Sequence, residues 1–150
     1  MKTTRLIMMI LVLFVIGCKP KSTDSKKVFD SNKWEQGKTV SLKLKTDKAV
    51  QHQKLIIHIS HVDGIQFPVL PIQIAKKSPD GKIEKMAINL EFVDKSGERL
   101  SDCSGDYCDY KSVIDSNFTM TPNEEYQFDI TNDVKLPYIP GIMQMELIIE

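Results

Sequence analysis

The sequence predicts an all-β protein, folded as an antiparallel β-sandwich of Greek-key or immunoglobulin-like type. Apolar and polar residues alternate with a period of two in several short segments after Val28. Turn-forming residues separate these segments, and no stretch of about ten residues or more carries a helical apolar stripe with caps. We expect around seven strands in about 120 residues, with a small open barrel as the alternative architecture.

The N-terminal segment is predicted to be a secretory signal. Residues 6–16 form an unbroken apolar run that follows Lys2 and Arg5. In a helix this run spans about 16 Å, roughly half of a 30 Å hydrocarbon core, so it is too short for a permanent membrane span. The run ends directly at Gly17, and residues 1–17 are therefore expected to be a cleaved lipoprotein signal peptide.

Cys18 is the predicted site of lipid attachment. The run Val15-Ile16-Gly17-Cys18 resembles a bacterial lipobox, in which the cysteine thiol receives a diacylglyceryl group and the chain is cleaved before it. Two or three acyl chains hold a protein on a membrane stably, whereas one does not. The alternative is an ordinary signal peptide whose cysteine is incidental. Because Lys19 rather than aspartate follows the cysteine, the outer membrane is favoured over retention in the inner membrane.

The chain after the signal is divided into a tether and one domain. Residues 18–27 carry the lipidated cysteine and no large apolar side chain, so we expect a flexible tether. Residues 28–150 are expected to form the β-sandwich, which is long enough to fold without a metal ion or an oligomer. After cleavage the chain would carry 18 basic and 20 acidic residues. This balance provides no basic field for a nucleic-acid partner.

The first half of the domain contains three predicted strands. Residues 40–45 alternate, which indicates a strand with one buried face. Residues 54–62 are apolar on both faces, so this strand is expected at the centre of a sheet. Residues 67–76 follow, and because Pro68 and Pro71 lack ladder donors, the first half of this strand is expected at an edge or a bulge.

The second half contains a hairpin and two further strands. A turn at residues 78–81 is expected to join residues 67–76 to a strand over 86–92. Residues 102–116 are polar and rich in aspartate, and we expect a long loop there. Strands follow at residues 126–130 and 142–149. In the last strand, the side chains expected on one face are Met143, Met145, Leu147 and Ile149.

Cys103 and Cys108 are candidates for a local disulfide. Four residues separate them in one exported segment, and an oxidising compartment favours their pairing. The alternative is a pair of free thiols. A zinc site lacks a second Cys or His pair nearby, and a catalytic cysteine lacks a local histidine.

The other polar residues do not predict a metal site or a catalytic site. His58 and His61 are three residues apart on a predicted strand, so they point to opposite faces and cannot chelate one ion. Trp34 is expected in the core or at a sheet edge rather than as a ligand platform. Four acids of the expected loop lack the alternating spacing of a calcium loop and are expected to be solvated. These acids are Asp102, Asp106, Asp109 and Asp115.

No motif of a known catalytic or cofactor-binding class is present. The sequence contains no G-x-S-x-G, P-loop or H-E-x-x-H pattern. We therefore expect a protein that is not an enzyme, with no catalytic residues, no metal ligands and no cofactor.

The order of these features resembles the gliding-motility lipoprotein H family, the GldH-like lipoproteins. The resemblance covers nearly the whole mature chain and implies a small lipoprotein of gliding bacteria or their non-motile relatives, without catalytic activity. It further implies a place in a cell-envelope machine for motility and protein secretion. The features that carry it are the lipobox Cys18, a short tether, Val28-Phe29-Asp30, Trp34, residues 54–62, the hairpin at 78–82, and the closing segments 126–130 and 141–143.

The expected function is that of a non-enzymatic, lipid-anchored cell-envelope protein that contacts other envelope proteins. The alternative is a ligand- or glycan-binding surface lipoprotein, and a hydrolase or an inhibitor is a third class. A binding lipoprotein requires a pocket or an exposed aromatic patch. An aromatic patch exists only if four side chains converge on the surface rather than scatter. These are Phe67, Tyr107, Tyr110 and Tyr138.

Overall fold

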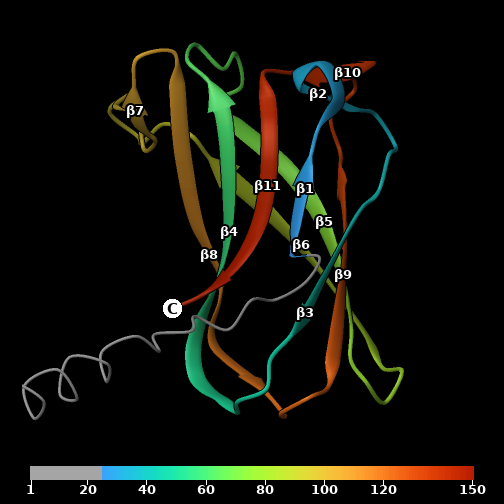
Figure 1. Ribbon diagram of the computed structural model, residues 1–150. Helices are drawn as coiled ribbons and strands as arrows, with labels where there is room; N and C mark the ends of the chain where they lie inside the picture. The colour runs from blue at the N-terminus through green and yellow to red at the C-terminus, as the bar shows by residue number, and fades with distance from the viewer. Residues whose placement is uncertain (1–24) are drawn as a thin grey trace, which may run out of the picture.

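Two antiparallel sheets face each other in the computed structural model, which describes residues 25–150 (Figure 1). The predicted antiparallel β-sandwich is thereby confirmed. The five-stranded sheet has the order β1 (Lys26–Val28), β11 (Ile142–Ile149), β4 (Val50–Val62), β8 (Tyr107–Met120) and β7 (Asp102–Ser104). The four-stranded sheet has the order β3 (Val40–Lys45), β9 (Glu125–Asn132), β5 (Val69–Lys77) and β6 (Ile83–Glu91).

The chain passes repeatedly from one sheet to the other. β3 and β5 lie in the four-stranded sheet, whereas the intervening β4 lies in the five-stranded sheet. As a result β9 lies between β3 and β5, and β4 lies between β11 and β8. A 3-10 turn at Asp30–Asn32 precedes a separate small ladder, in which β2 (Lys33–Glu35) pairs with β10 (Tyr138–Pro140). None of the helical segments in residues 25–150 is long and apolar enough to span a membrane.

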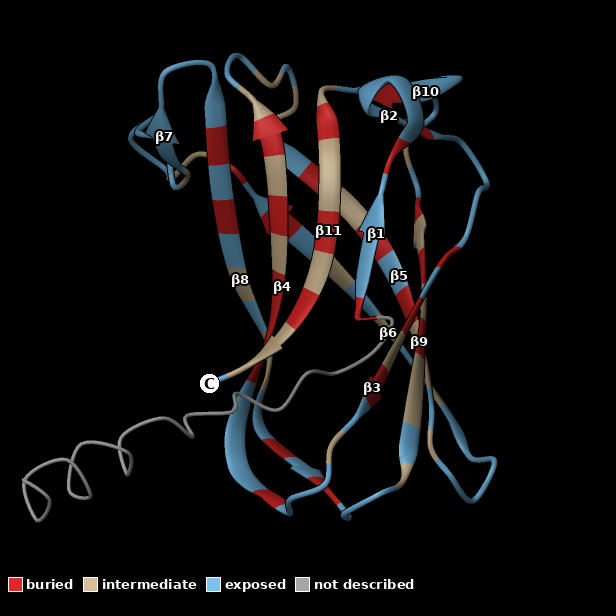
Figure 2. Cartoon of the chain, in the orientation of Figure 1, coloured by how far each residue is buried: buried red, intermediate tan, exposed pale blue. Residues whose placement is uncertain are grey.

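The core is built from the alternating apolar positions that the sequence indicates. In β3 the buried side chains are those of Val40, Leu42 and Leu44, while their neighbours reach solvent. The same alternation produces the buried stripes visible along the strands in Figure 2. Trp34 is 1% exposed and packs beside Phe29, so it belongs to the core as predicted.

The predicted central strand and the predicted hairpin are both confirmed. β4 has a strand on each side, in agreement with its apolar residues on both faces. β5 and β6 pair along their whole length, and the turn between them closes with a hydrogen bond from Ser78 N to Lys82 O of 2.9 Å. Gly81 has a φ of 84°, a left-handed conformation that glycine adopts without strain.

The proline-containing part of β5 lies where one ladder ends. Pro71 pairs with Asn89 of β6, but the pairing of β5 with β9 begins only at Ile72. The carbonyl of Pro71 accepts a hydrogen bond from Asp133 N, and proline has no N–H to return. The expectation that the first half of this strand would lie at an edge is therefore confirmed on the β9 side.

The expectation of a long loop at residues 102–116 is wrong. Residues 102–104 form β7, and β8 begins at Tyr107 and continues to Met120. The inward positions of β8 include Cys108, Tyr110, Phe118 and Met120, separated by polar residues of the solvent-facing side. The period of two is hard to recognise in β8 because few of its inward positions are aliphatic. A cysteine and a tyrosine occupy core positions there instead.

The end of the tether and the register of β11 also differ from expectation. The expected tether includes residues 25–27, but Ser25 is buried, and Lys26 and Lys27 pair with β11. Backbone hydrogen bonds, which do not depend on apolar side chains, hold this segment: Leu147 N donates to Ser25 O at 2.9 Å. In β11, a register shift at Met143 buries Ile142 in its place, so Met143 is not on the core face of Met145 and Leu147.

Candidate functional site

Polar side chains gather on the outer face of the five-stranded sheet around His58. The strand register places His58 of β4 between Lys111 of β8 and Glu146 of β11. His58 Nε2 lies 2.9 Å from Asp109 Oδ1, and Ser60 Oγ donates to the same carboxylate oxygen at 2.7 Å. His58 Nδ1 is buried, has no hydrogen-bond partner, and lies 3.9 Å from a Glu146 oxygen.

This cluster contains the residue types of a catalytic triad but in a different order. In a triad, histidine bonds to the serine whose proton it accepts, and the carboxylate orients that histidine. Here Asp109 lies between Ser60 and His58, so His58 does not accept the Ser60 proton. The hydrogen bond from Ser60 and then the neighbouring His58 lower the pKa of Asp109. The arrangement stabilises a carboxylate and does not activate a nucleophile.

Asp109→Asn is expected to lower stability only where the native carboxylate is charged. A pKa lowered in the folded state contributes stability above the unfolded pKa, and that contribution is lost as the pH falls through the folded pKa. Because the Asp109 side chain is 60% exposed, we expect a loss below about 1 kcal/mol at pH 7. The difference from wild type should shrink at pH 2 in urea denaturation. Asp106→Asn, which removes an exposed acid with the same change in charge, should show no such pH dependence.

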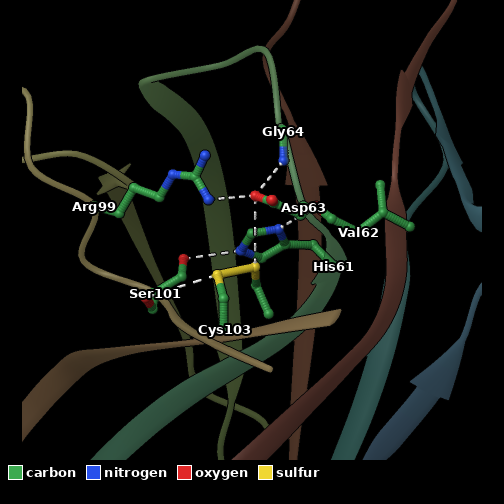
Figure 3. The surroundings of a disulfide bond; sticks show 8 residues. His61, Val62, Asp63, Gly64, Arg99, Ser101 and Cys103 are labelled. Carbon is green, nitrogen blue, oxygen red and sulfur yellow. Dashed lines mark hydrogen bonds and ion pairs between the residues drawn. A yellow bond between two sulfur atoms is a disulfide. The ribbon is translucent and has the colours of Figure 1, made fainter. Parts of the chain in front are cut away.

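A second cluster lies at the end of β4 near the disulfide (Figure 3). His61 is 2% exposed, and its ring contacts the Phe92 ring edge-on. His61 Nδ1 lies 2.8 Å from the Val62 carbonyl, which can only accept, so Nδ1 carries the proton. His61 Nε2 lies 2.8 Å from Ser101 Oγ, so this nitrogen also has a hydrogen-bond partner. Both ring nitrogens are therefore engaged, and neither is free for a metal ion.

His58 and His61 point to opposite faces of β4, as their odd spacing predicts. His58 lies on the outer face, whereas His61 points into the molecule. His52, the third histidine, is exposed and has a left-handed φ of 52° at an irregular part of β4. Its Nδ1 lies 2.5 Å from Asn117 Oδ1. The three histidines are thus in three separate surroundings.

The disulfide joins β7 to β8 beside this cluster. Cys103 and Cys108 are bonded to each other, and their Cα atoms are 4.0 Å apart. Asp63 pairs with Arg99 and accepts a hydrogen bond from Gly64 N at 2.7 Å. Within residues 25–150, Asp63 and the two cysteines are the one group whose ligand atoms could surround a metal ion. Their sulfur atoms are held in the disulfide, so they are not thiolate ligands.

Replacing both bridged cysteines by serine is expected to lower the free energy of unfolding by about 2 kcal/mol. The bridge closes a short loop, and the chain-entropy relation gives a value of that size for such a loop. Urea denaturation of the Cys103→Ser/Cys108→Ser variant would measure it. Wild-type protein treated with a reductant should show the same loss, and intact mass after alkylation without reduction should show neither thiol labelled.

Two of the hollows within residues 25–150 bear on function. A small cavity of about 80 Å³ lies beside His61, Ser101 and Arg99, too small for most metabolites. A larger open cleft of about 660 Å³ lies at the other end of β4, close to Ser25. Its apolar lining includes Val50, Leu147 and Ile149, and Lys45 and Lys48 line it as well.

The four aromatic side chains that could form a sugar-binding patch do not converge. Tyr110 is 4% exposed and Phe67 packs against the core. Tyr107 and Tyr138 are exposed, but they belong to β8 and β10, which lie on opposite sides of the sandwich in Figure 1. The Tyr138 ring is in addition covered by the Lys33 ammonium at 4.7 Å. These positions do not favour a glycan site.

The sequence did not indicate the cluster around His61. His61, Asp63, Arg99 and Ser101 meet across some 36 to 40 positions of sequence, and no spacing rule joins them. The only local signal was the cysteine pair in the same region. Cys18, the predicted lipid attachment site, lies outside the described residues.

Comparison with known proteins gives one match. A family model described as GldH lipoprotein matches residues 21–147. This range runs from before β1 almost to the end of β11 and therefore includes both sheets. No curated protein and no solved structure matches the chain.

Proposed function

The chain belongs to the GldH lipoprotein family, and from this membership we propose that it is a non-enzymatic component of a cell-envelope machine that acts through contacts with other proteins. The family makes it a lipid-anchored envelope protein related to gliding motility. The finer proposal is that Cys18 carries the lipid in the outer membrane. In this view the sandwich serves as the folded body that partners bind.

The observation that carries the proposal is the extent of the family match. It begins at residue 21, after the predicted signal and Cys18, and continues through the folded domain. The match therefore depends on the sandwich itself, and the sandwich is the part that we expect to make contacts. A match to the N-terminal signal alone would have indicated only export.

The described polar clusters support a role without catalysis. Ser60 is bonded to Asp109 rather than to a base, and the histidine of the Ser101–His61 pair is only 2% exposed. The cavity beside Ser101 and His61 has room for about two or three water molecules but not for a typical substrate. These arrangements stabilise strand ends and loops.

Mild-detergent purification from the native envelope would test this proposal. A tag placed after Glu150 through a flexible linker leaves the N-terminal cysteine free for lipidation. We expect a defined set of envelope proteins to co-purify in constant ratio, and an unrelated tagged lipoprotein should not capture them. Recovery of the lipoprotein alone, from a strain in which the tagged protein supports motility, would contradict a docking role.

The cleft near Ser25 favours a second candidate function, binding of a small apolar ligand. Its volume of about 660 Å³ lies in the range of ligand sites, and apolar side chains dominate its wall. A fluorescent fatty-acid probe titrated into purified lipoprotein would test it. Saturable binding that is lost in Ile149→Arg would support this candidate, and binding unchanged by that substitution would not.

A further inference from the structure

β6 forms an open edge of the four-stranded sheet. It pairs with β5 on one side, and on the other side no strand within residues 25–150 continues the ladder (Figure 1). Its nine residues contain no proline and no bulge in the pairing with β5. Proteins usually protect such edges with these devices, because unpaired backbone groups accept another strand.

The register identifies which backbone groups face outward. Phe92 N donates to Pro68 O and Ser78 N donates to Lys82 O, which places the even-numbered residues of β6 in hydrogen-bonded pairs with β5. The odd-numbered residues therefore direct their N–H and C=O groups away from β5. The Glu91 N–H is bonded to the Tyr110 hydroxyl. Within residues 25–150, four further residues of β6 have outward N–H and C=O groups that face no partner strand. These are Ile83, Lys85, Ala87 and Asn89.

The side chains along β6 are arranged for a neighbouring strand. Met86 and Ile88, on the core side, are only half-buried although they pack against the core. Ile83 is 57% exposed. On the outer side Lys85 and Glu91, which have opposite charges, lie six residues apart on one face. An added strand would cover the half-buried pair and meet both charges.

We propose that this edge binds a second copy of the chain, with the two β6 strands antiparallel and centred on Ile88. In this register Lys85 lies opposite Glu91 of the partner subunit, and the symmetry repeats the pair. On the core side Ile88 meets its own equivalent and Met86 meets Leu90 of the partner subunit. The outward backbone groups of Ala87 then face those of Asn89 of the partner subunit, as an antiparallel ladder requires, while the Glu91 N–H keeps its bond to Tyr110.

The symmetry of this pairing is compatible with two lipid anchors in one membrane. This argument rests on the proposed function, because it assumes that both copies are anchored. The two-fold axis of an antiparallel strand pair runs perpendicular to the sheet, so both five-stranded sheets lie on the same side of the joined four-stranded sheets. Ser25 precedes β1 in the five-stranded sheet. Ser25 of each copy therefore lies on the same side of the joined four-stranded sheets.

Charge reversal tests the register. Sedimentation equilibrium of the mature lipoprotein, in detergent micelles present in excess, should show a dimer. Lys85→Glu alone and Glu91→Lys alone should each raise the dimer dissociation constant about tenfold or more, because each places two like-charged pairs across the edge. The combined Lys85→Glu/Glu91→Lys variant should restore dimerisation. Lys95→Glu, an exposed residue in a turn, controls for net charge and should have no effect.

A proline substitution tests the edge itself. Ala87→Pro removes an outward N–H and no bond to β5, so the fold should persist by circular dichroism and thermal unfolding. We expect this variant to be monomeric. A wild type that is monomeric at about 100 μM, or a folded Ala87→Pro that remains a dimer, would overturn the proposal. Loss of an envelope partner from Ala87→Pro with a monomeric wild type would assign the edge to a different protein. In each case the co-purification experiment judges the proposed function separately.

Discussion

A Cys18→Ser protein is expected to carry no lipid and to leave the membrane fraction. The serine hydroxyl does not replace the thiol that receives the diacylglyceryl group at the Val15-Ile16-Gly17-Cys18 pattern. Each buried CH₂ of an acyl chain contributes about 0.8 kcal/mol to membrane binding. Without the acyl chains, nothing else in the predicted architecture anchors the chain stably. Incorporation of labelled fatty acid, followed by fractionation, measures the effect.

The matched control is the Cys103→Ser/Cys108→Ser variant, which removes the other two cysteines. It should incorporate fatty acid as the wild type does, because the bridged pair lies in β7 and β8. Equal labelling of Cys18→Ser and wild type would show that the cysteine is incidental. If the anchor is needed to hold the sandwich near its partners, motility should fail in Cys18→Ser even though the sandwich still folds.

Where apolar residues alternate without interruption, the sequence was sufficient to predict the fold. β3, β9 and the β5–β6 hairpin follow the period of two, and β4 is central because both of its faces are apolar. Pro71 is a sharper case, since its missing N–H coincides with the end of the β5–β9 ladder. In these elements one local rule and the tertiary structure favour the same arrangement.

The sequence prediction was wrong where tertiary contacts replace apolar periodicity. β8 has Cys108 and Tyr110 at core positions, and between Tyr110 and Phe118 no inward residue is fully buried. Lys26 and Lys27 form a strand because β11 offers them a free edge, which the composition of the tether does not reveal. The shift at Met143 is a backbone irregularity, and a one-residue shift exchanges the two faces of a strand.

The cluster around His61 could not be predicted because its members are distant in sequence. Ser101 reaches His61 only after the chain has formed β5, β6 and the turn that follows Phe92. The sequence did predict that His58 and His61 would not lie together, because their odd spacing places them on opposite faces of the strand. The site is therefore a product of topology more than of any motif.

His61→Ala is expected to lower the free energy of unfolding by about 3 kcal/mol. The substitution removes a fully buried ring from beside Phe92 and leaves the Val62 carbonyl and the Ser101 hydroxyl without their partner. Urea denaturation at pH 7 measures the loss. His52→Asn is the control, because this histidine is exposed and asparagine tolerates its left-handed φ, so its effect should stay within about 0.5 kcal/mol.

The same variant distinguishes docking from catalysis. Ser101 and His61 are in the correct bonding order for a nucleophile and its base, with the Val62 carbonyl orienting the ring. If the protein only docks, motility of the His61→Ala strain should follow the folded fraction and recover at a lower growth temperature. Ser101→Ala, which removes the hydroxyl but keeps the buried ring, should then support motility at every temperature. An anchored, folded Ser101→Ala protein without function would instead assign a chemical role to this pair.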